Sequence, residues 1–283
     1  MDYELMMNGN IKIGEAAPKF QAASTQGNVS LEDYKGKWLV FFSHPGDFTP
    51  VCTTEMVAFS RANSYFEKAN CKLLGLSIDS NSSHLAWVYD IYLKTGITIP
   101  FPIVADRNGE IARKYGMISN AVSNTETVRN VYIIDDKQIV RSILIYPQTV
   151  GRNISEILRI VRALQAVDAN NLMAPANWMP CEKMIMKMPQ TFKELEERSK
   201  EVEKYKSGMN WYLAFKNPNN CEDFSIGTNN NELISDYAQN TNQEENRNYA
   251  GRINNVVNRP ENDKVKNNTN MRNQQTLQWK NFR

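Results

Sequence analysis

Cys52 is the residue whose surroundings in the sequence most clearly predict chemistry. It comes shortly after the apolar run 38–42, whose unbroken aromatic and aliphatic side chains are typical of a buried strand. A helical pattern begins after Pro50, with apolar side chains on one face: Met56, Phe59, Ala62 and Phe66. Cys52 therefore lies at a helix N-terminus, where free backbone N–H groups and the helix dipole stabilise an anion. We expect a reactive thiolate there, although most free cysteines are only small buried hydrophobes.

The residues around Cys52 match a known motif. Pro45, Thr49 and Cys52 form the pattern P-x-x-x-T-x-x-C, which resembles the peroxidatic motif of peroxiredoxins. The longer string S-H-P-x-D-F-T-P-V-C-T-T-E is similar to the one-cysteine, or Prx6-type, subfamily. The resemblance runs from near Ile11 to near Phe215, and it includes the strings L-S-I-D-S, H-L-A-W, F-P-I, G-R-N and P-A-N-W.

The resemblance implies a thiol-dependent peroxidase of antioxidant defence and redox homeostasis, acting on hydrogen peroxide and organic hydroperoxides. The Cys52 sulfur would attack the O–O bond and become a sulfenic acid. Thr49 can accept a hydrogen bond from the peroxide or donate one to the sulfur, and Pro45 can shield the thiolate from water. Arg129, at the start of an apolar strand, matches the active-site arginine of the family and supplies a fixed cation. No metal and no cofactor are implied.

Three further residues match supporting positions of the family. Glu55 is expected to orient the arginine network, or to be only a carboxylate favoured by the helix dipole. His44 could hydrogen-bond near the sulfur or titrate with it, although a lone histidine is often only packed. Arg152 resembles a second arginine near the site, but it could simply open the predicted helix 154–166.

The return of the sulfenic acid to a thiol needs a second sulfur. Cys71 is expected in the core of a strand, and Cys181 follows a proline in a linker, so neither is an obvious resolving cysteine. Cys221 lies a few residues beyond the aromatic run 211–215 and could condense with the sulfenic acid. If it does not, the enzyme has a single working cysteine, and an external thiol such as thioredoxin or glutathione reduces it.

The order of elements predicts an α/β fold. Strands are expected at 71–78, 128–134 and 139–145, with helices at 83–94, 107–115 and 154–166. The resemblance makes this a thioredoxin-like fold with a mixed central sheet, followed by a small C-terminal dimerisation domain. We therefore expect a peroxidase domain over residues 1–167 and a C-terminal domain or arm over 168–222.

The C-terminal part of the chain changes in character. A charged helix is expected at 192–206, and aromatic residues at 211–215 are typical of a contact with a partner subunit, or of a lid within one chain. Residues 223–283 are rich in Asn and charged side chains and are expected to be disordered. The resemblance thus implies a homodimer or a higher homo-oligomer, while the function of the tail is not readable.

Composition excludes several other classes. The formal net charge of +2 predicts no nucleic-acid partner, and neither a secretion signal nor a membrane-spanning run is evident. The four cysteines show no close pairing, which argues against a disulfide scaffold or a zinc site and favours a reducing compartment. We therefore expect a cytoplasmic enzyme.

Two other functions use the same cysteine. A thiol-disulfide oxidoreductase of the thioredoxin type would need C-x-x-C, but Thr53, Thr54 and Glu55 follow Cys52. A peroxide sensor, or a chaperone-like oligomer that passes oxidation to partners, would form the same sulfenic acid. Catalytic turnover of peroxide, as opposed to a single stoichiometric consumption, distinguishes the peroxidase from the sensor.

Overall fold

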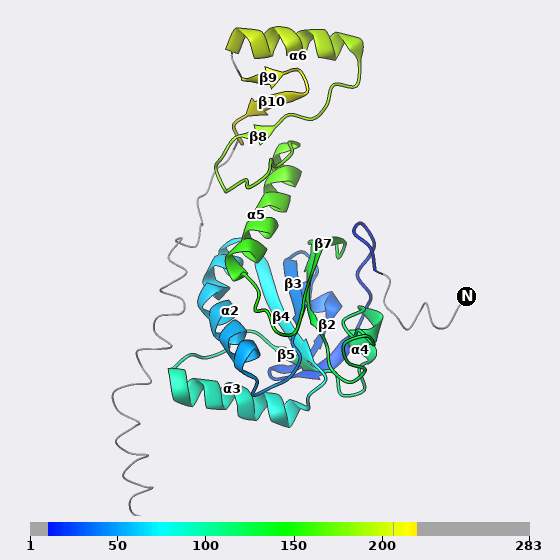
Figure 1. Cartoon of the computed structure of the whole chain (residues 1–283), viewed down its shortest axis with the longest axis vertical. Helices are drawn as coiled ribbons and strands as arrows, with labels where there is room; N and C mark the ends of the chain where they lie inside the picture. Colours follow the sequence, from blue (N-terminus) through cyan, green and yellow to red (C-terminus); the bar gives the residue numbers. More distant parts are fainter. Residues whose placement is uncertain (1–10, 206, 220–283) are drawn as a thin grey trace, which may run out of the picture. The chain divides into compact units, whose positions relative to one another are not determined.

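The computed structural model describes residues 11–205 and 207–219. The chain divides into two units, Met1–Asn230 and Asn231–Arg283, and all described residues belong to the first. The elements of the described residues, most of them labelled in Figure 1, are β1 Gln21–Ser24, β2 Gly27–Ser30, η1 Leu31–Tyr34, β3 Trp38–Ser43, α2 Pro50–Lys68, β4 Cys71–Ser77, α3 Asn81–Thr95, β5 Ile103–Ala105, α4 Glu110–Lys114, β6 Arg129–Ile134, β7 Val140–Tyr146, α5 Ile154–Asn170, β8 Met184–Ile185, α6 Phe192–Tyr205, β9 Gly208–Asn210 and β10 Leu213–Lys216.

Seven strands form one mixed sheet, in the order β2-β1-β5-β4-β3-β6-β7. β3 pairs in parallel with β4, and β4 pairs in parallel with β5. On its other edge β3 pairs antiparallel with β6, which pairs antiparallel with β7. The predicted mixed sheet is therefore present. Because β3 lies between β4 and β6, the loop after β3 and the start of β6 meet at the same end of the sheet.

The two faces of β3 pack against different layers. Its six residues are all buried, as the unbroken apolar run predicted. Leu39 and Phe41 belong to a core cluster that includes residues of α4 and η1. On the other face Phe42 stacks on Phe59 of α2 with ring centroids 4.2 Å apart. Helices α2 and α5 lie on one side of the sheet and α4 lies on the other (Figure 1). Successive side chains of a strand point to opposite faces of the sheet, so β3 packs against α2 on one face and against the core cluster on the other.

Helix α2 begins immediately after Thr49, its extended N-cap residue, with Pro50 at the first helical position. Proline suits that position because its missing N–H would have no partner within the helix. Cys52 is consequently the third helical residue, in the first turn, as the sequence predicted. Its helix presents free backbone N–H groups at the end of the sheet where β6 begins.

Two predicted helices have different bounds in the structure. The short helix predicted over 107–115 is α4, which begins only at Glu110 because Gly109 before it is in the left-handed region, with φ of 69°. The carboxylate of Asp106 accepts the N–H groups of Ile111 and Ala112, which secures the start of this helix. Helix α5 continues to Asn170, beyond the predicted end at 166, and Asn171 in the left-handed region then ends it.

A smaller sheet follows α5. Its strands are arranged in the order β8-β10-β9, and α6 contacts β9. Trp178 and Met184 pack with Ala163 of α5 and Leu172 in a separate apolar cluster. The role of this segment in dimerisation stays a prediction, as does the division into domains at residue 167. Over residues 11–205 and 207–219, no helix is both long enough and apolar enough to span a bilayer.

Candidate active site

The sulfur of Cys52 and the guanidinium of Arg129 meet at the end of β3. Arg129 is the first residue of β6, and its Nη1 lies 3.3 Å from Cys52 Sγ. Cys52 has an exposed fraction of 0% and Arg129 of 2%. The structure thus brings together the two residues that the sequence places 77 positions apart. A guanidinium hydrogen bond to a thiolate is charge-assisted and strongest where water is excluded.

Glu55 joins two arginines beneath this pair. It lies one turn after Cys52 on α2, and its Oε2 accepts hydrogen bonds at 2.7 Å from Nη1 of Arg129 and from Nη2 of Arg152. Its Oε1 accepts the backbone N–H of Arg152 at 2.9 Å and Nε of the same residue at 2.8 Å. Burial alone would raise the pKa of Glu55, but the charges and hydrogen bonds of Arg152 and then the charge of Arg129 hold it below 4.5. Glu55 therefore orients the arginines and is more than a helix-dipole carboxylate.

The charges of this buried group do not cancel. Two guanidinium groups and one carboxylate leave an excess of one positive charge beside the sulfur. A buried uncompensated charge is costly, so this position attracts negative charge. The arrangement therefore places positive charge beside the sulfur in addition to that of the helix dipole.

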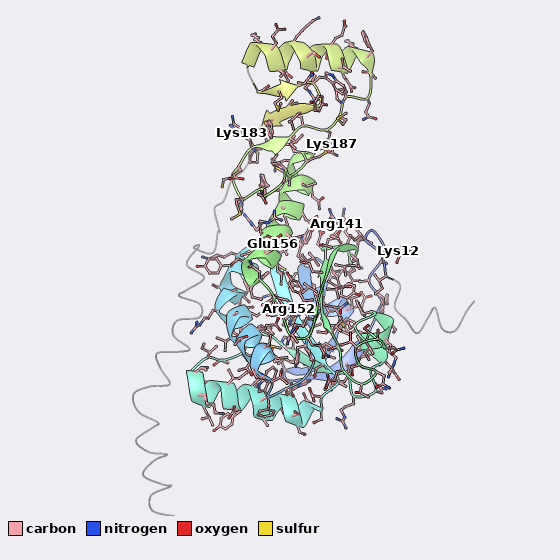
Figure 2. All side chains as sticks on the ribbon, in the orientation of Figure 1. Lys12, Arg141, Arg152, Glu156, Lys183 and Lys187 are labelled. Carbon is pink, nitrogen blue, oxygen red and sulfur yellow. The ribbon has the colours of Figure 1, made fainter. Side chains whose placement is uncertain are left out.

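Each arginine is also anchored to backbone. Nε and Nη2 of Arg129 donate to the carbonyl oxygen of Gln148 at 3.0 and 2.6 Å. Arg152 lies inside the domain (Figure 2), and its Nη1 donates to the carbonyls of Ser43 and Asn130. Arg152 does more than open α5, because every polar group of its side chain is used within the site. Gln148 was not singled out from the sequence, since its contribution is a main-chain carbonyl that any residue type could provide.

Thr49 and Pro45 belong to the loop between β3 and α2. The Thr49 hydroxyl donates to the carbonyl of Gly46 at 2.9 Å, so of its two expected roles it is placed for accepting a hydrogen bond from a peroxide. Pro45 is buried and adds no N–H donor to the loop. Phe48, between Asp47 and Thr49, is exposed and takes a φ of 56°. A bulky residue in the left-handed region indicates a loop that its surroundings hold in place.

His44 contacts Asp47 of the same loop. Its Nε2 lies 3.1 Å from Oδ1 of Asp47, while its Nδ1 has no hydrogen-bond partner. Burial lowers the pKa of His44 below 6.5, although the Asp47 carboxylate opposes the shift. The structure shows no hydrogen bond from His44 to Cys52, so the hypothesis that it bonds near the sulfur is not supported by this geometry. Asp47 was present in the sequence motif, but it was not recognised there as a partner of histidine.

The other cysteines have different surroundings. Cys71 begins β4, and burial strongly raises the pKa of its thiol. Cys181 is disulfide-bonded, whereas Cys52 and Cys71 are free. The absence of close pairing in the sequence argued against a disulfide scaffold, and it did not reveal the bond at Cys181, because spacing along the chain does not show which sulfurs the fold brings together. Cys221, the predicted resolving cysteine, lies outside the described residues.

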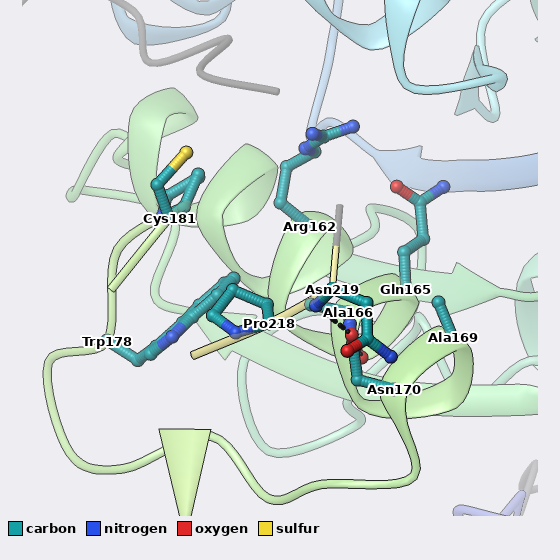
Figure 3. Close-up of a pocket in the computed structure, with 10 residues that line it drawn as sticks. Arg162, Gln165, Ala166, Ala169, Asn170, Trp178, Cys181, Pro218 and Asn219 are labelled. Carbon is teal, nitrogen blue, oxygen red and sulfur yellow. Dashed lines mark hydrogen bonds between the residues drawn. The ribbon is translucent and has the colours of Figure 1, made fainter. Parts of the chain in front are cut away.

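A cavity of about 270 Å³ lies beside Cys181 and is separate from the Cys52 site (Figure 3). Arg162, Gln165 and Asn170 of α5 line one part of it, and Trp178 lines another. None of the residues that surround Cys52 contributes to this cavity.

Comparison with known proteins identifies the family of the chain. The AhpC/TSA family model matches residues 13–143. Peroxiredoxin 2 of Caldanaerobacter subterraneus subsp. tengcongensis is 56% identical over 205 residues, which cover 72% of this chain and 92% of that protein. The peroxiredoxin of Aquifex aeolicus is 52% identical over 192 residues, which cover 68% of this chain and 83% of that protein.

Solved structures show the same fold. A cysteine-to-serine mutant of peroxiredoxin 6 of Arenicola marina has a TM-score of 0.65 at 34% identity and covers 74% of this chain and 99% of its own. The yeast mitochondrial one-cysteine peroxiredoxin has a TM-score of 0.62 at 37% identity and covers 73% of this chain and 99% of its own. Fold and site together define an oxidoreductase with a thioredoxin-like fold, as predicted. The chain belongs to the peroxiredoxin family, and the similarity to peroxiredoxin 6 agrees with the one-cysteine, Prx6-type subfamily.

Proposed function

We propose that this peroxiredoxin reduces hydrogen peroxide and organic hydroperoxides through a sulfenic acid at Cys52, in antioxidant defence and redox homeostasis. The observation that carries the proposal is the 3.3 Å contact between Arg129 Nη1 and the buried sulfur at the start of α2. The family supports thiol-dependent peroxidase activity in general. We infer from the site that Cys52 is the reacting residue and that hydroperoxides are the substrates.

The proposed reaction is a nucleophilic displacement at oxygen. The Cys52 thiolate donates an electron pair to the nearer peroxide oxygen, the S–O bond forms and the O–O bond breaks. Sulfur is oxidised to the sulfenic acid, and the leaving oxygen takes up a proton to become water or an alcohol. Arg129 stabilises the negative charge as it moves from sulfur to the leaving oxygen, and the Thr49 hydroxyl accepts a hydrogen bond from the peroxide. Pro45 keeps bulk water from the sulfur.

Glu55 and Arg152 act on the reaction through Arg129. Glu55 holds the guanidinium by one hydrogen bond at 2.7 Å, and Arg152 fixes Glu55 by three. Because these groups are buried and their hydrogen bonds are mutually satisfied, Arg129 is positioned before the peroxide arrives. His44 contributes to the same loop through Asp47.

An external thiol completes the cycle in our proposal. One thiol condenses with the sulfenic acid, releasing water and forming a mixed disulfide, and a second thiol reduces that disulfide to restore Cys52. Thioredoxin or glutathione fits this chemistry, and both systems are named for the yeast mitochondrial relative. Cys221 is a candidate for the first of these two thiols, although it lies outside the described residues.

We further propose that the enzyme is a cytoplasmic homodimer or higher homo-oligomer that acts on neither membranes nor nucleic acids. The segment around Trp211 and Tyr212 offers aromatic side chains for the subunit contact, with Tyr212 49% exposed. The near balance of charge gives no general attraction to phosphate polymers. Gel filtration with light scattering would test the oligomeric state.

Peroxide consumption tests the central proposal. Wild type, Cys52→Ser and Cys221→Ser should be compared with a thiol reductant present, together with non-reducing gels after one equivalent of peroxide. Many turnovers by wild type and none by Cys52→Ser support a peroxidase. Consumption of a single equivalent by wild type would favour the sensor or chaperone-like alternative, and full activity of Cys52→Ser would refute the site. A cross-linked dimer that disappears in Cys221→Ser would assign the resolving step.

A further inference from the structure

Both histidines of the chain lie in one buried cluster with Asp47 beside the active-site loop. The chain contains two histidines in all, His44 after β3 and His84 on α3. The side chains of His44 and His84 are 0% exposed, and that of Asp47 is 2% exposed. His44 Nε2 and His84 Nδ1 both face the Asp47 carboxylate, at 3.1 and 2.9 Å. The cluster links α3 to the loop that carries Thr49.

The hydrogen bonds of His84 define its protonation. Its Nε2 lies 3.2 Å from the carbonyl oxygen of Val104, which can only accept a hydrogen bond. Its Nδ1 lies 3.0 and 2.9 Å from the two carboxylate oxygens of Asp47, which also only accept when ionised. A neutral imidazole has one N–H and could satisfy only one of these sides. His84 must therefore carry a proton on both nitrogens and be an imidazolium.

The carboxylate of Asp47 is ionised in the same arrangement. Burial would raise the pKa of Asp47, but the hydrogen bonds from His44 and His84, followed by the charge of His84, hold it far below 3.8. His44, by contrast, donates through Nε2 and has no partner at Nδ1, which suits a neutral ring. The cluster then contains one negative and one positive charge and is neutral as a whole.

Asp47 connects this pair to the reacting residues. Its backbone N–H donates to Oδ2 of Asp79, and its side chain is held by the two histidines, so both parts of the residue are fixed. The next residues are Phe48, in the left-handed region, and Thr49, the N-cap of the helix that carries Cys52. A loop held in an unfavourable conformation needs surroundings that oppose its relaxation. The Asp47 contacts provide that restraint directly before Thr49.

We propose that Asp47 and His84 form a buried carboxylate–imidazolium pair that positions the Thr49 loop at Cys52, and that the charges of the pair are required along with its hydrogen bonds. Asp47 and His84 are thus positioning residues for the reaction. The inference rests on the proposed peroxidase function for its kinetic part, while the protonation of His84 stands on the hydrogen bonds alone.

A metal ion is the competing occupant of this cluster. His44, Asp47 and His84 place one potential ligand atom each within 4.8 Å of one another. The observed separations of 2.9 to 3.1 Å between nitrogen and oxygen are those of direct hydrogen bonds. His44 also lacks the outer partner that a metal-bound histidine almost always has on its second nitrogen. The geometry points to a proton shared within an ion pair.

The charged groups around the pair come from three further parts of the chain. Asp79, after β4, accepts the Asp47 N–H, and the charge of Arg152, before α5, reaches His44. His44 itself lies between the pair and β3. Burial, and to a smaller extent the charges of His84 and Arg152, lower the pKa of His44 and favour its neutral form. His84 therefore supplies the positive charge that neutralises Asp47 within the cluster.

Nitrogen-15 NMR of the full chain labelled only in histidine gives a direct test, because two rings produce all the signals. We expect one imidazolium with two protonated nitrogens and one neutral ring protonated at Nε2, at pH 7. Two neutral rings, or one equivalent of a transition metal in the purified protein, would overturn the inference. This NMR measurement does not depend on peroxide turnover. The inference about His84 can therefore fail while the peroxidase assignment holds, and the peroxidase assignment can fail while the inference about His84 holds.

Kinetics of Asp47→Asn, His84→Gln and the double variant test the positioning role. Each single variant leaves one buried charge unpaired, and we expect kcat/KM for hydrogen peroxide to fall about 10- to 100-fold. The double variant retains neutral hydrogen-bonding groups and should recover to within about tenfold of wild type. Losses that simply multiply in the double variant would show that the charges do not matter.

Discussion

Cys52 on α2 and Cys71 on β4 are two free cysteines, and each has an exposed fraction of 0%. Their surroundings differ. The Cys71 thiol lies 3.8 Å from the backbone carbonyl of Lys72, and burial raises its pKa although a backbone hydrogen bond from Val40 opposes the shift. Cys52 lies at a helix N-terminus with the guanidinium of Arg129 at 3.3 Å. Burial by itself therefore protects the neutral thiol, and a buried sulfur becomes reactive where a fixed positive charge accompanies it.

Replacing Cys52 and Cys71 in turn by serine should give the largest difference in peroxidase activity. Cys52→Ser should lower kcat/KM for hydrogen peroxide by about 10³-fold or more, because it removes the nucleophile. Cys71→Ser, the matched control, should keep activity within about twofold at a temperature where it remains folded. A coupled assay of peroxide consumption with circular dichroism of both variants makes the comparison. Equal losses in the two variants would show that the cysteines are not functionally distinct.

Glu55→Gln should be the most destabilising change among the charged residues near Cys52. It leaves the guanidinium groups of Arg129 and Arg152 buried without a carboxylate, at a cost of about 3–5 kcal/mol in the free energy of unfolding. Glu67→Gln breaks an exposed pair with Lys72 and should cost about 1 kcal/mol or less. Urea unfolding followed by fluorescence measures both values. Similar small losses for the two variants would contradict a buried ionic network.

Arg129→Met should slow the reaction while leaving the cysteine in place. One charged donor is lost from the transition state, so kcat/KM should fall by about 10²- to 10³-fold. Arg129→Lys keeps a charge but loses the contacts to Gln148, and an intermediate loss is expected. Arg141→Met removes a partly exposed arginine paired with Asp168 and serves as the control. An unchanged kcat/KM in Arg129→Met would contradict the claim that the Arg129 guanidinium makes Cys52 more reactive than Cys71.

Mild acid should produce the smallest effect, through His44. Because burial lowers the pKa of His44 below 6.5, the unfolded chain binds a proton between pH 6 and pH 5 that the folded protein resists. The free energy of unfolding should therefore decrease as pH falls in this range, by up to about 1 kcal/mol from this ring. The difference between wild type and His44→Gln isolates the contribution. Stability that rises on acidification, or an equal pH dependence in both proteins, would contradict a neutral buried His44.

Much of the site was predictable because its members are close to Cys52 in sequence or begin a strand. The apolar run of β3 and the helical pattern after Pro50 placed Cys52 correctly, and the resemblance to peroxiredoxins identified Arg129. The pairing of Asp47 with His84 was not predicted, since 37 positions separate them and only the packing of α3 brings them together. The contribution of Gln148 was invisible because it is made by a carbonyl. Likewise, no local pattern revealed the disulfide of Cys181.

The most direct test of the central claim is to find which sulfur the first peroxide molecule oxidises. Wild-type protein should receive one equivalent of hydrogen peroxide at pH 7 in the presence of a sulfenic acid trap, followed by digestion and mass spectrometry. We predict rapid labelling of the peptide that contains Cys52 and none of the peptide that contains Cys71. Labelling of Cys71, or peroxide that persists while Cys52 stays unmodified, would contradict the account.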